Sequence, residues 1–132
     1  SVVEKFILFH KKAGNDISIL TANLRNPFGY GRIIKKRGVV SEIREELDAT
    51  PREKNIKTVN GGIYIFPGPK IFSLLKKVEL NPRKKEYYLT DVIKIAAAKG
   101  MKIRNMTLKE GAFLLGVNTK DDLIKVNKIA KY

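Results

Sequence analysis

The sequence contains no cysteine and no tryptophan, and His10 is its only histidine. Without cysteine the chain can form no disulfide, no thiolate zinc site and no cysteine nucleophile, a profile that is compatible with a reducing cytoplasm. His10 has no second metal ligand at a suitable spacing, so we interpret it as a packing residue of a helix. These absences exclude thiol chemistry and a histidine-based metal site.

Long apolar runs are also absent. No run reaches the ~18 residues that a bilayer-spanning helix needs, and the N-terminus lacks the basic region and apolar core of a signal peptide. A chain of 132 residues can build one ordinary hydrophobic core and is too short for two comfortable domains. We therefore expect a soluble, cytoplasmic chain with no membrane partner.

Acidic residues are scarce. The chain has 13 acidic and 27 basic residues, which gives a formal net charge of +14. This charge strengthens attraction to any polyanion, including nucleic acid and phosphorylated metabolites. The basic residues are spread along the chain in pairs and triplets, so most are expected to be solvated surface. A nucleic-acid-binding module that stacks bases on Phe28 and Tyr30 stays an alternative, although no recognised nucleic-acid motif is present.

Strand-like and helix-like patterns alternate along the chain. Ser1 and Glu4 match a capping box, which predicts a helix that ends near Gly14. The turn around Arg37 and Gly38 predicts a β-hairpin. We expect strands at residues 16–24, 33–36, 39–46, 58–66 and 102–108, and helices after Ser1, after Thr50, around 71–78, at 89–99 and after Thr119. This order predicts an α/β fold in which helices are layered on a mixed sheet.

Two glycines bracket an aromatic residue in the segment 26–33, which reads NPFGYGRI. Glycine lets a backbone N–H come within bonding distance of a ligand, and Pro27 stiffens the entry to the loop. The alternative is that Gly29 and Gly31 only shape a connection between two strands.

Two later positions could also bind a ligand. Strand alternation puts Glu45 on the same side as Ile43, where an ionised carboxylate could accept hydrogen bonds from the hydroxyls of a ligand. A salt bridge to a lysine, or a bulge that turns Glu45 outward, is the alternative. Asn60 precedes Gly61 and Gly62, so an amide projects beside a stretch without side chains, which either a ligand or a tightly packed element would fill.

Four further segments follow NPFGYGRI in order, namely IREELDATP at 43–51, VNGGIY at 59–64, EYYLTD at 86–91 and GVN at 116–118. Together these motifs resemble the sugar-phosphate nucleotidyltransferases, most closely the uridyltransferase (pyrophosphorylase) domain of the bacterial bifunctional N-acetylglucosamine-1-phosphate uridyltransferases. The similarity runs from about Ile17 to the C-terminus. It implies part of a Rossmann-like nucleotidyltransferase domain with a mixed sheet and a β-hairpin.

The resemblance implies a pocket for a hexosamine phosphate. It implies that Glu45 contacts the sugar, and that Asn118 helps to ligate Mg²⁺, for which an amide oxygen is a suitable hard ligand. Without the resemblance, Asn118 would be interpreted as a turn former and Tyr88 as a core residue. The family usually has threonine in place of Gly61. The implied substrate-binding residues are Tyr30, Gly31, Glu45, Asn60, Glu86, Tyr88 and Asn118, the last also as metal ligand.

The family begins with a glycine-rich loop that holds the nucleotide phosphates, followed by an aspartate that shares the metal, and neither motif is present. The resemblance therefore implies that residues 1–132 are the C-terminal, sugar-binding half of the domain, with the missing N-terminal half as partner. The whole enzyme would make UDP-N-acetylglucosamine from UTP and N-acetylglucosamine 1-phosphate, a step of peptidoglycan precursor biosynthesis, and release pyrophosphate. We expect the chain alone to be inactive and to self-associate through an unpaired strand edge. Alternatives are another hexose-1-phosphate nucleotidyltransferase and a nucleotide-sugar sensor.

Overall fold

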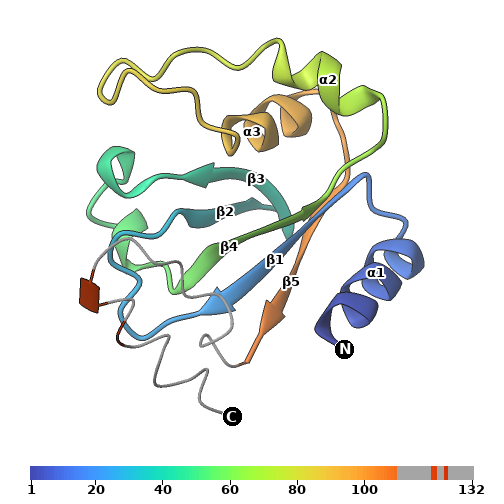
Figure 1. The fold of residues 1–132 in the computed structure, drawn as a ribbon, viewed down its shortest axis with the longest axis horizontal. Helices are drawn as coiled ribbons and strands as arrows, with labels where there is room; N and C mark the ends of the chain where they lie inside the picture. The colour runs from blue at the N-terminus through green and yellow to red at the C-terminus, as the bar shows by residue number, and fades with distance from the viewer. Residues whose placement is uncertain (110–119, 122–123, 125–132) are drawn as a thin grey trace.

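The computed structural model describes residues 1–109, 120–121 and 124. The elements along the chain (Figure 1) are α1 (Val2–Ala13), β1 (Ile17–Asn23), β2 (Arg32–Lys36), β3 (Val39–Arg44), the 3-10 turns η1 (Glu46–Asp48) and η2 (Glu53–Asn55), β4 (Thr58–Ile65), α2 (Lys70–Leu75), α3 (Asp91–Ala98) and β5 (Ile103–Leu108). The predicted α/β class is confirmed. Most of the helix predicted after Thr119 lies outside the described residues.

The strands form one mixed sheet in the order β3-β2-β4-β1-β5. β1 and β5 run parallel, whereas the other neighbouring pairs are antiparallel. β2 and β3 form the predicted hairpin, and its turn residues Arg37 and Gly38 both have positive φ, 51° and 79°. Two successive residues with positive φ are what a two-residue turn needs to match the twist of its strands.

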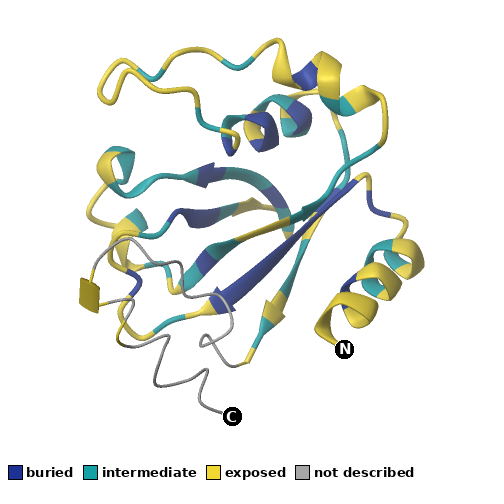
Figure 2. Cartoon of the chain, viewed as in Figure 1, coloured by how far each residue is buried: buried dark blue, intermediate teal, exposed yellow. Residues whose placement is uncertain are grey.

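Helices cover both faces of the sheet. α2 and α3 lie over one face and α1 lies against the other, beside β1 and β5 (Figure 1). Alternate residues of β1 pack to opposite sides, since Ile17 and Ile19 join the cluster under α2 and α3 while Leu20 and Ala22 pack with Phe6 of α1. β1 is therefore buried along almost its whole length (Figure 2).

The ends of α1 confirm two local predictions. The side chain of Ser1 accepts a hydrogen bond from the backbone N–H of Glu4, and the Glu4 carboxylate accepts one from the N-terminal ammonium group. Gly14 ends the helix with a left-handed φ of 61°. His10 is half-buried, and its Nδ1 lies 2.9 Å from the hydroxyl of Ser18, in agreement with a packing role. None of the helices in the described ranges is long and apolar enough to cross a membrane.

Most predicted boundaries differ from the structure by one to three residues, and two differences lie near the hairpin. β3 ends at Arg44 rather than at Glu46, because the chain turns there into η1. The helix expected after Thr50 is only the 3-10 turn η2, although its start signal is correct, since Thr50 and Glu53 exchange the two hydrogen bonds of a capping box at 3.0 and 3.2 Å. Both differences lie in the connection that leads from the hairpin to β4.

Candidate functional site

Gly31 and Glu45 lie opposite each other at the open end of the hairpin. Ile33 of β2 pairs with Ile43 of β3, so two residues further along, Gly31 and Glu45 are the next pair that faces the same side. This side is the one covered by α2 and α3, because both isoleucines belong to the cluster beneath those helices. The alternation in the sequence therefore predicted the correct face for Glu45.

The backbone of Gly31 lies close against two side chains. A Cβ at this position would lie 2.8 Å from Cγ2 of Ile43, and 3.4 and 3.5 Å from Oε1 and Oε2 of Glu45. Real Cβ atoms do not approach other atoms as closely as 2.8 Å, so only glycine fits without movement of its neighbours. The Glu45 carboxylate thus lies directly beside the loop backbone.

Asn60 joins this pair from β4. Its backbone N–H donates to the carbonyl oxygen of Gly31 at 2.8 Å. Its side-chain Oδ1 accepts from the N–H of Gly62 at 3.0 Å, and its Nδ2 donates to the hydroxyl of Tyr64 at 2.6 Å. Gly61 and Gly62 form a bulge in the pairing of β4 with β1, where Gly62 has a φ of 75°. The two glycines therefore bend the strand around the Asn60 amide.

Glu45 is held by Thr90, which precedes α3. The Thr90 hydroxyl donates to Oε1 of Glu45 at 2.9 Å, and Thr90 itself is buried. Within residues 1–109, Glu45 makes no ion pair, so the salt bridge that sequence reasoning offered as an alternative is not found there. Oε2 accepts no hydrogen bond from a described residue and keeps its acceptor capacity.

Tyr64 completes the group. Its ring stacks on Phe66 with centroids 5.3 Å apart and is half-buried. Burial raises the pKa of the Tyr64 hydroxyl, and the charge of Glu45 raises it further, while the hydrogen bond from Asn60 has the opposite effect. We call Gly31, Glu45, Asn60, Tyr64 and Thr90 the Glu45 cluster.

The other predicted site residues do not all join this cluster. Tyr30 is its neighbour in the loop, and its backbone N–H donates to Pro27 at 3.1 Å. Glu86 is exposed, and Tyr88 lines a separate hollow of about 490 Å³ with Leu75, Tyr87 and other residues of that region. Asn118 lies outside the described residues. The structure therefore brings together Gly31, Glu45 and Asn60, whereas the side chains of Glu86 and Tyr88 make no hydrogen bond to them within residues 1–109.

A second hollow, of about 280 Å³, borders Glu45 on the side of α3. Glu42, Asp48 and Asp91 also line it, together with Lys94. Burial raises the pKa of Asp91, and Asp48 adds to this effect while Lys94 opposes it. No group of three histidine, cysteine or acidic side chains in the described ranges is arranged to hold a metal. These residues by themselves do not form the magnesium site that the resemblance implies.

Arg32 is a residue of the site region that sequence reasoning missed. Strand alternation directs it to the opposite face from Glu45, and its side chain is only 2% exposed. Its guanidinium donates to the carbonyls of Tyr30 at 2.5 Å and Lys54 at 3.2 Å, and it forms an ion pair with Glu46. Arg32 thereby ties the loop, η1 and η2 together beneath the Glu45 cluster.

Solved structures share this fold. A Bacillus anthracis structure named as a glucose-1-phosphate thymidylyltransferase, with sucrose bound, superposes with a TM-score of 0.70 at 17% identity and covers 98% of this chain and 49% of its own. An apo-UDP-glucose pyrophosphorylase superposes with a TM-score of 0.63 at 20% identity, over 83% of this chain and 40% of its own. The fold is therefore that of the sugar-phosphate nucleotidyltransferases.

Sequence comparison identifies particular relatives. The chain is 42% identical over 131 residues to the bifunctional protein GlmU of Acholeplasma laidlawii. This alignment covers 98% of the chain and 28% of that protein. The chain is 45% identical over 115 residues to GlmU of Aquifex aeolicus, covering 86% of this chain and 25% of that protein. The resemblance found in the sequence is confirmed, and the first match includes α1, which the sequence reasoning had left out. The chain spans about a quarter of the length of these relatives, and no protein-family model matches it.

Proposed function

We propose that this chain is the sugar-binding part of a nucleotidyltransferase that makes UDP-N-acetylglucosamine from UTP and N-acetylglucosamine 1-phosphate. The observation that carries the proposal is the Glu45 cluster, in which Gly31 lies against the Glu45 carboxylate and is hydrogen-bonded to Asn60, so that three residues expected to bind the sugar adjoin. The similarity to GlmU over 98% of the chain supports it. The chain lacks cysteine, in keeping with a cytoplasmic enzyme.

The free hydrogen-bonding groups of the cluster suit a hexose. Oε2 of Glu45 can accept from a sugar hydroxyl, and an ionised acceptor forms the stronger kind of hydrogen bond. Nδ2 of Asn60 keeps one hydrogen, and Oδ1 one lone pair, that no described residue uses. The acceptor on Glu45 and the donor on Asn60 stand on the two segments that flank Gly31 in the sheet. This pattern fits a ligand that has both hydroxyl and carbonyl groups, as an N-acetylhexosamine does.

In the proposed reaction, a phosphate oxygen of the sugar 1-phosphate attacks the α-phosphorus of UTP. A new P–O bond forms while the bond to the β-phosphate breaks, and pyrophosphate leaves. No protein nucleophile is needed, so the contribution of this chain is to bind and orient the sugar phosphate. Mg²⁺, for which we propose Asn118 as one ligand, would neutralise charge on the phosphates when bound. We propose Tyr30, Glu86 and Tyr88 as further residues that line the pocket.

Calorimetric titration of the 132-residue chain with N-acetylglucosamine 1-phosphate tests the proposal. We expect Glu45→Gln to weaken binding by roughly 10-fold or more, because a hydrogen bond to a charged group contributes about 1.5–3 kcal/mol. Glu79→Gln, at an exposed glutamate without an ion pair among the described residues, is the matched control. Unchanged affinity in the Glu45 variant would refute the proposed sugar site. We also expect no release of pyrophosphate from UTP by this chain alone.

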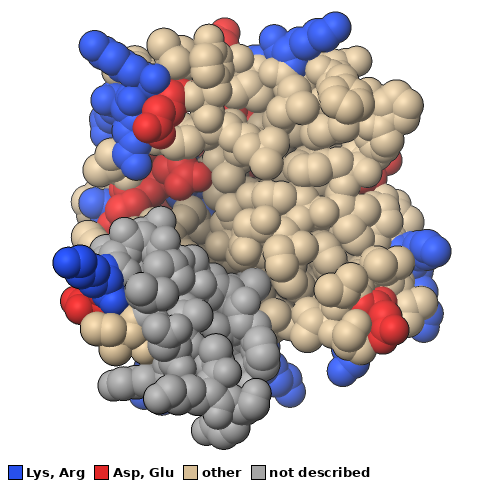
Figure 3. Space-filling model, viewed as in Figure 1, with Lys and Arg blue, Asp and Glu red and all other residues tan. Residues whose placement is uncertain are grey.

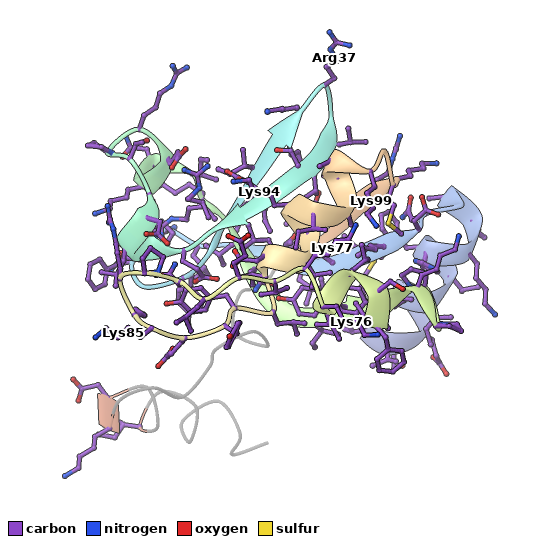
Figure 4. All side chains as sticks on the ribbon, turned by 90° about the horizontal axis from the view of Figure 1, so that it is seen from above. Arg37, Lys76, Lys77, Lys85, Lys94 and Lys99 are labelled. Atoms are coloured by element: carbon purple, nitrogen blue, oxygen red, sulfur yellow. The ribbon has the colours of Figure 1, made fainter. Side chains whose placement is uncertain are left out.

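Binding measurements with the same chain distinguish the proposed function from two alternatives. Tighter binding of glucose 1-phosphate than of the N-acetylhexosamine would favour another sugar nucleotidyltransferase. A nucleic-acid-binding module is favoured by the net charge of +14. However, the basic groups lie in separate places on the face seen in Figure 3, and Arg37 at the hairpin tip and Lys85 lie far apart in Figure 4. RNA affinity that falls steeply with salt would support that alternative.

A further inference from the structure

The Asn60 carboxamide is held in a defined orientation. Its Oδ1 accepts from the backbone N–H of Gly62 at 3.0 Å, and its Nδ2 donates to the hydroxyl oxygen of Tyr64 at 2.6 Å. A backbone N–H can only donate, so the contact with Gly62 identifies the oxygen end of the amide. The remaining amide hydrogen then has one fixed direction instead of two.

We propose that Tyr64 is a positioning residue of the sugar site, which acts by fixing the Asn60 amide for the ligand. This inference rests on the function proposed above. Tyr64 was not among the residues predicted to bind substrate, and its part is to hold Asn60 rather than to contact the sugar itself. Loss of its hydroxyl leaves the amide fastened at the oxygen end only.

The tyrosine is suited to this role because its ring is fixed. Tyr64 pairs with Ile19 of β1, packs against the main hydrophobic cluster and stacks on Phe66 at 5.3 Å. A half-buried, stacked ring has few rotamers, so the hydroxyl oxygen is a stable anchor. By contrast, Tyr87 is 69% exposed, and its hydroxyl makes no hydrogen bond to a described residue.

The cluster uses the same arrangement twice. Thr90 donates its hydroxyl hydrogen to Glu45, and Tyr64 offers its hydroxyl oxygen to Asn60. Each polar group that faces the proposed ligand is therefore held by a hydroxyl from another part of the chain. Burial and the nearby Glu45 charge raise the pKa of Tyr64, so the hydroxyl stays neutral at physiological pH. Such support reduces the ordering that a ligand must impose on binding.

Tyr64→Phe, which removes only the hydroxyl, tests this inference by calorimetry. We expect the dissociation constant for N-acetylglucosamine 1-phosphate to rise about 3- to 10-fold, the effect of one neutral hydrogen bond. Tyr87→Phe is the matched control and should leave the constant unchanged. In an Asn60→Ala background, Tyr64→Phe should have no further effect, because the residue through which it acts is gone. An equal loss in both backgrounds would overturn the inference.

A second readout needs no ligand. In nuclear magnetic resonance spectra, the two Nδ2 hydrogens of Asn60 should move closer together in shift and exchange faster with water in Tyr64→Phe than in the wild type. Unchanged Asn60 signals would overturn the inference even if sugar binding is found. If the wild type binds no hexose phosphate while the Asn60 signals respond as expected, the proposed function fails and the contact between Tyr64 and Asn60 stands. Thermal unfolding of each variant verifies that the fold is intact.

Discussion

Replacing the buried Arg32 should destabilise the whole hairpin end of the sheet. In Arg32→Met, a side chain of similar length remains, but the ion pair with Glu46 and the hydrogen bonds to the carbonyls of Tyr30 and Lys54 are lost. Glu46 is only 14% exposed, so its carboxylate would keep its desolvation cost without a partner. The loop that contains Tyr30 and the turns η1 and η2 would lose the side chain that connects them.

The size of the effect follows from these contacts. Breaking a buried ion pair by removal of one partner costs about 3–5 kcal/mol. For a chain of this size, each kcal/mol lowers the melting temperature by roughly 4 °C, so we expect a fall of about 10–20 °C. Urea unfolding followed by circular dichroism measures the free energy, and a thermal scan measures the midpoint.

A double variant separates the ion pair from simple packing. Removing both partners in Arg32→Met with Glu46→Leu should restore much of the lost stability, because two apolar groups of similar volume replace a buried pair at little net cost. Arg52→Met, at an exposed arginine, should change the free energy of unfolding by less than about 0.5 kcal/mol. A loss below about 1 kcal/mol in Arg32→Met would refute the assigned role.

Three further predictions concern the site. Gly31→Ala should cost about 1–3 kcal/mol in urea unfolding, because the new Cβ meets Ile43 and the Glu45 carboxylate; a neutral effect would contradict the close approach. The raised pKa of Asp91 means that its stabilising contribution at low pH is lost as the pH rises through the folded-state pKa. The stability of the wild type relative to Asp91→Asn should therefore fall as the pH rises above the ordinary carboxyl pKa of 3.8, and a constant difference would argue against this shift. Alkaline absorbance titrations of the wild type and of Tyr64→Phe can be subtracted to isolate the tyrosinate signal of Tyr64. This signal should appear with a pKa above the ordinary value of 10.0.

Local patterns predicted the parts of the fold that local interactions determine. The capping box at Ser1, the left-handed Gly14 and the hairpin turn at Arg37 each involve residues within a few positions of one another, and each is present. Alternation along β3 gave the correct face for Glu45, because the pairing of β3 with β2 is regular from Glu42 to Arg44, beyond the register shift at Ser41. These features could be read without knowledge of the tertiary structure.

The composition of the Glu45 cluster could not be predicted in the same way. Thr90 is 45 residues from Glu45 in sequence, and only the packing of α3 on the sheet brings the two side chains together. Thr90 directly precedes α3, yet its side chain makes no capping hydrogen bond in the structure. The proximity of Tyr64 to Asn60 could have been predicted from the sequence, since Tyr64 is four residues after Asn60 and lies on the same face of β4.

The place of β4 in the sheet has a consequence for how the proposed site forms. β1 and β2 follow each other in the chain, joined by the loop with Gly31, yet β4 lies between them and arrives some 20 residues later. The hairpin can assemble early from local contacts, but Asn60 reaches Gly31 only when β4 inserts, a slower non-local step. A ligand that needs both residues would bind only molecules that have completed this step. It would then protect them from unfolding by mass action, so ligand-dependent refolding yield would report on strand insertion.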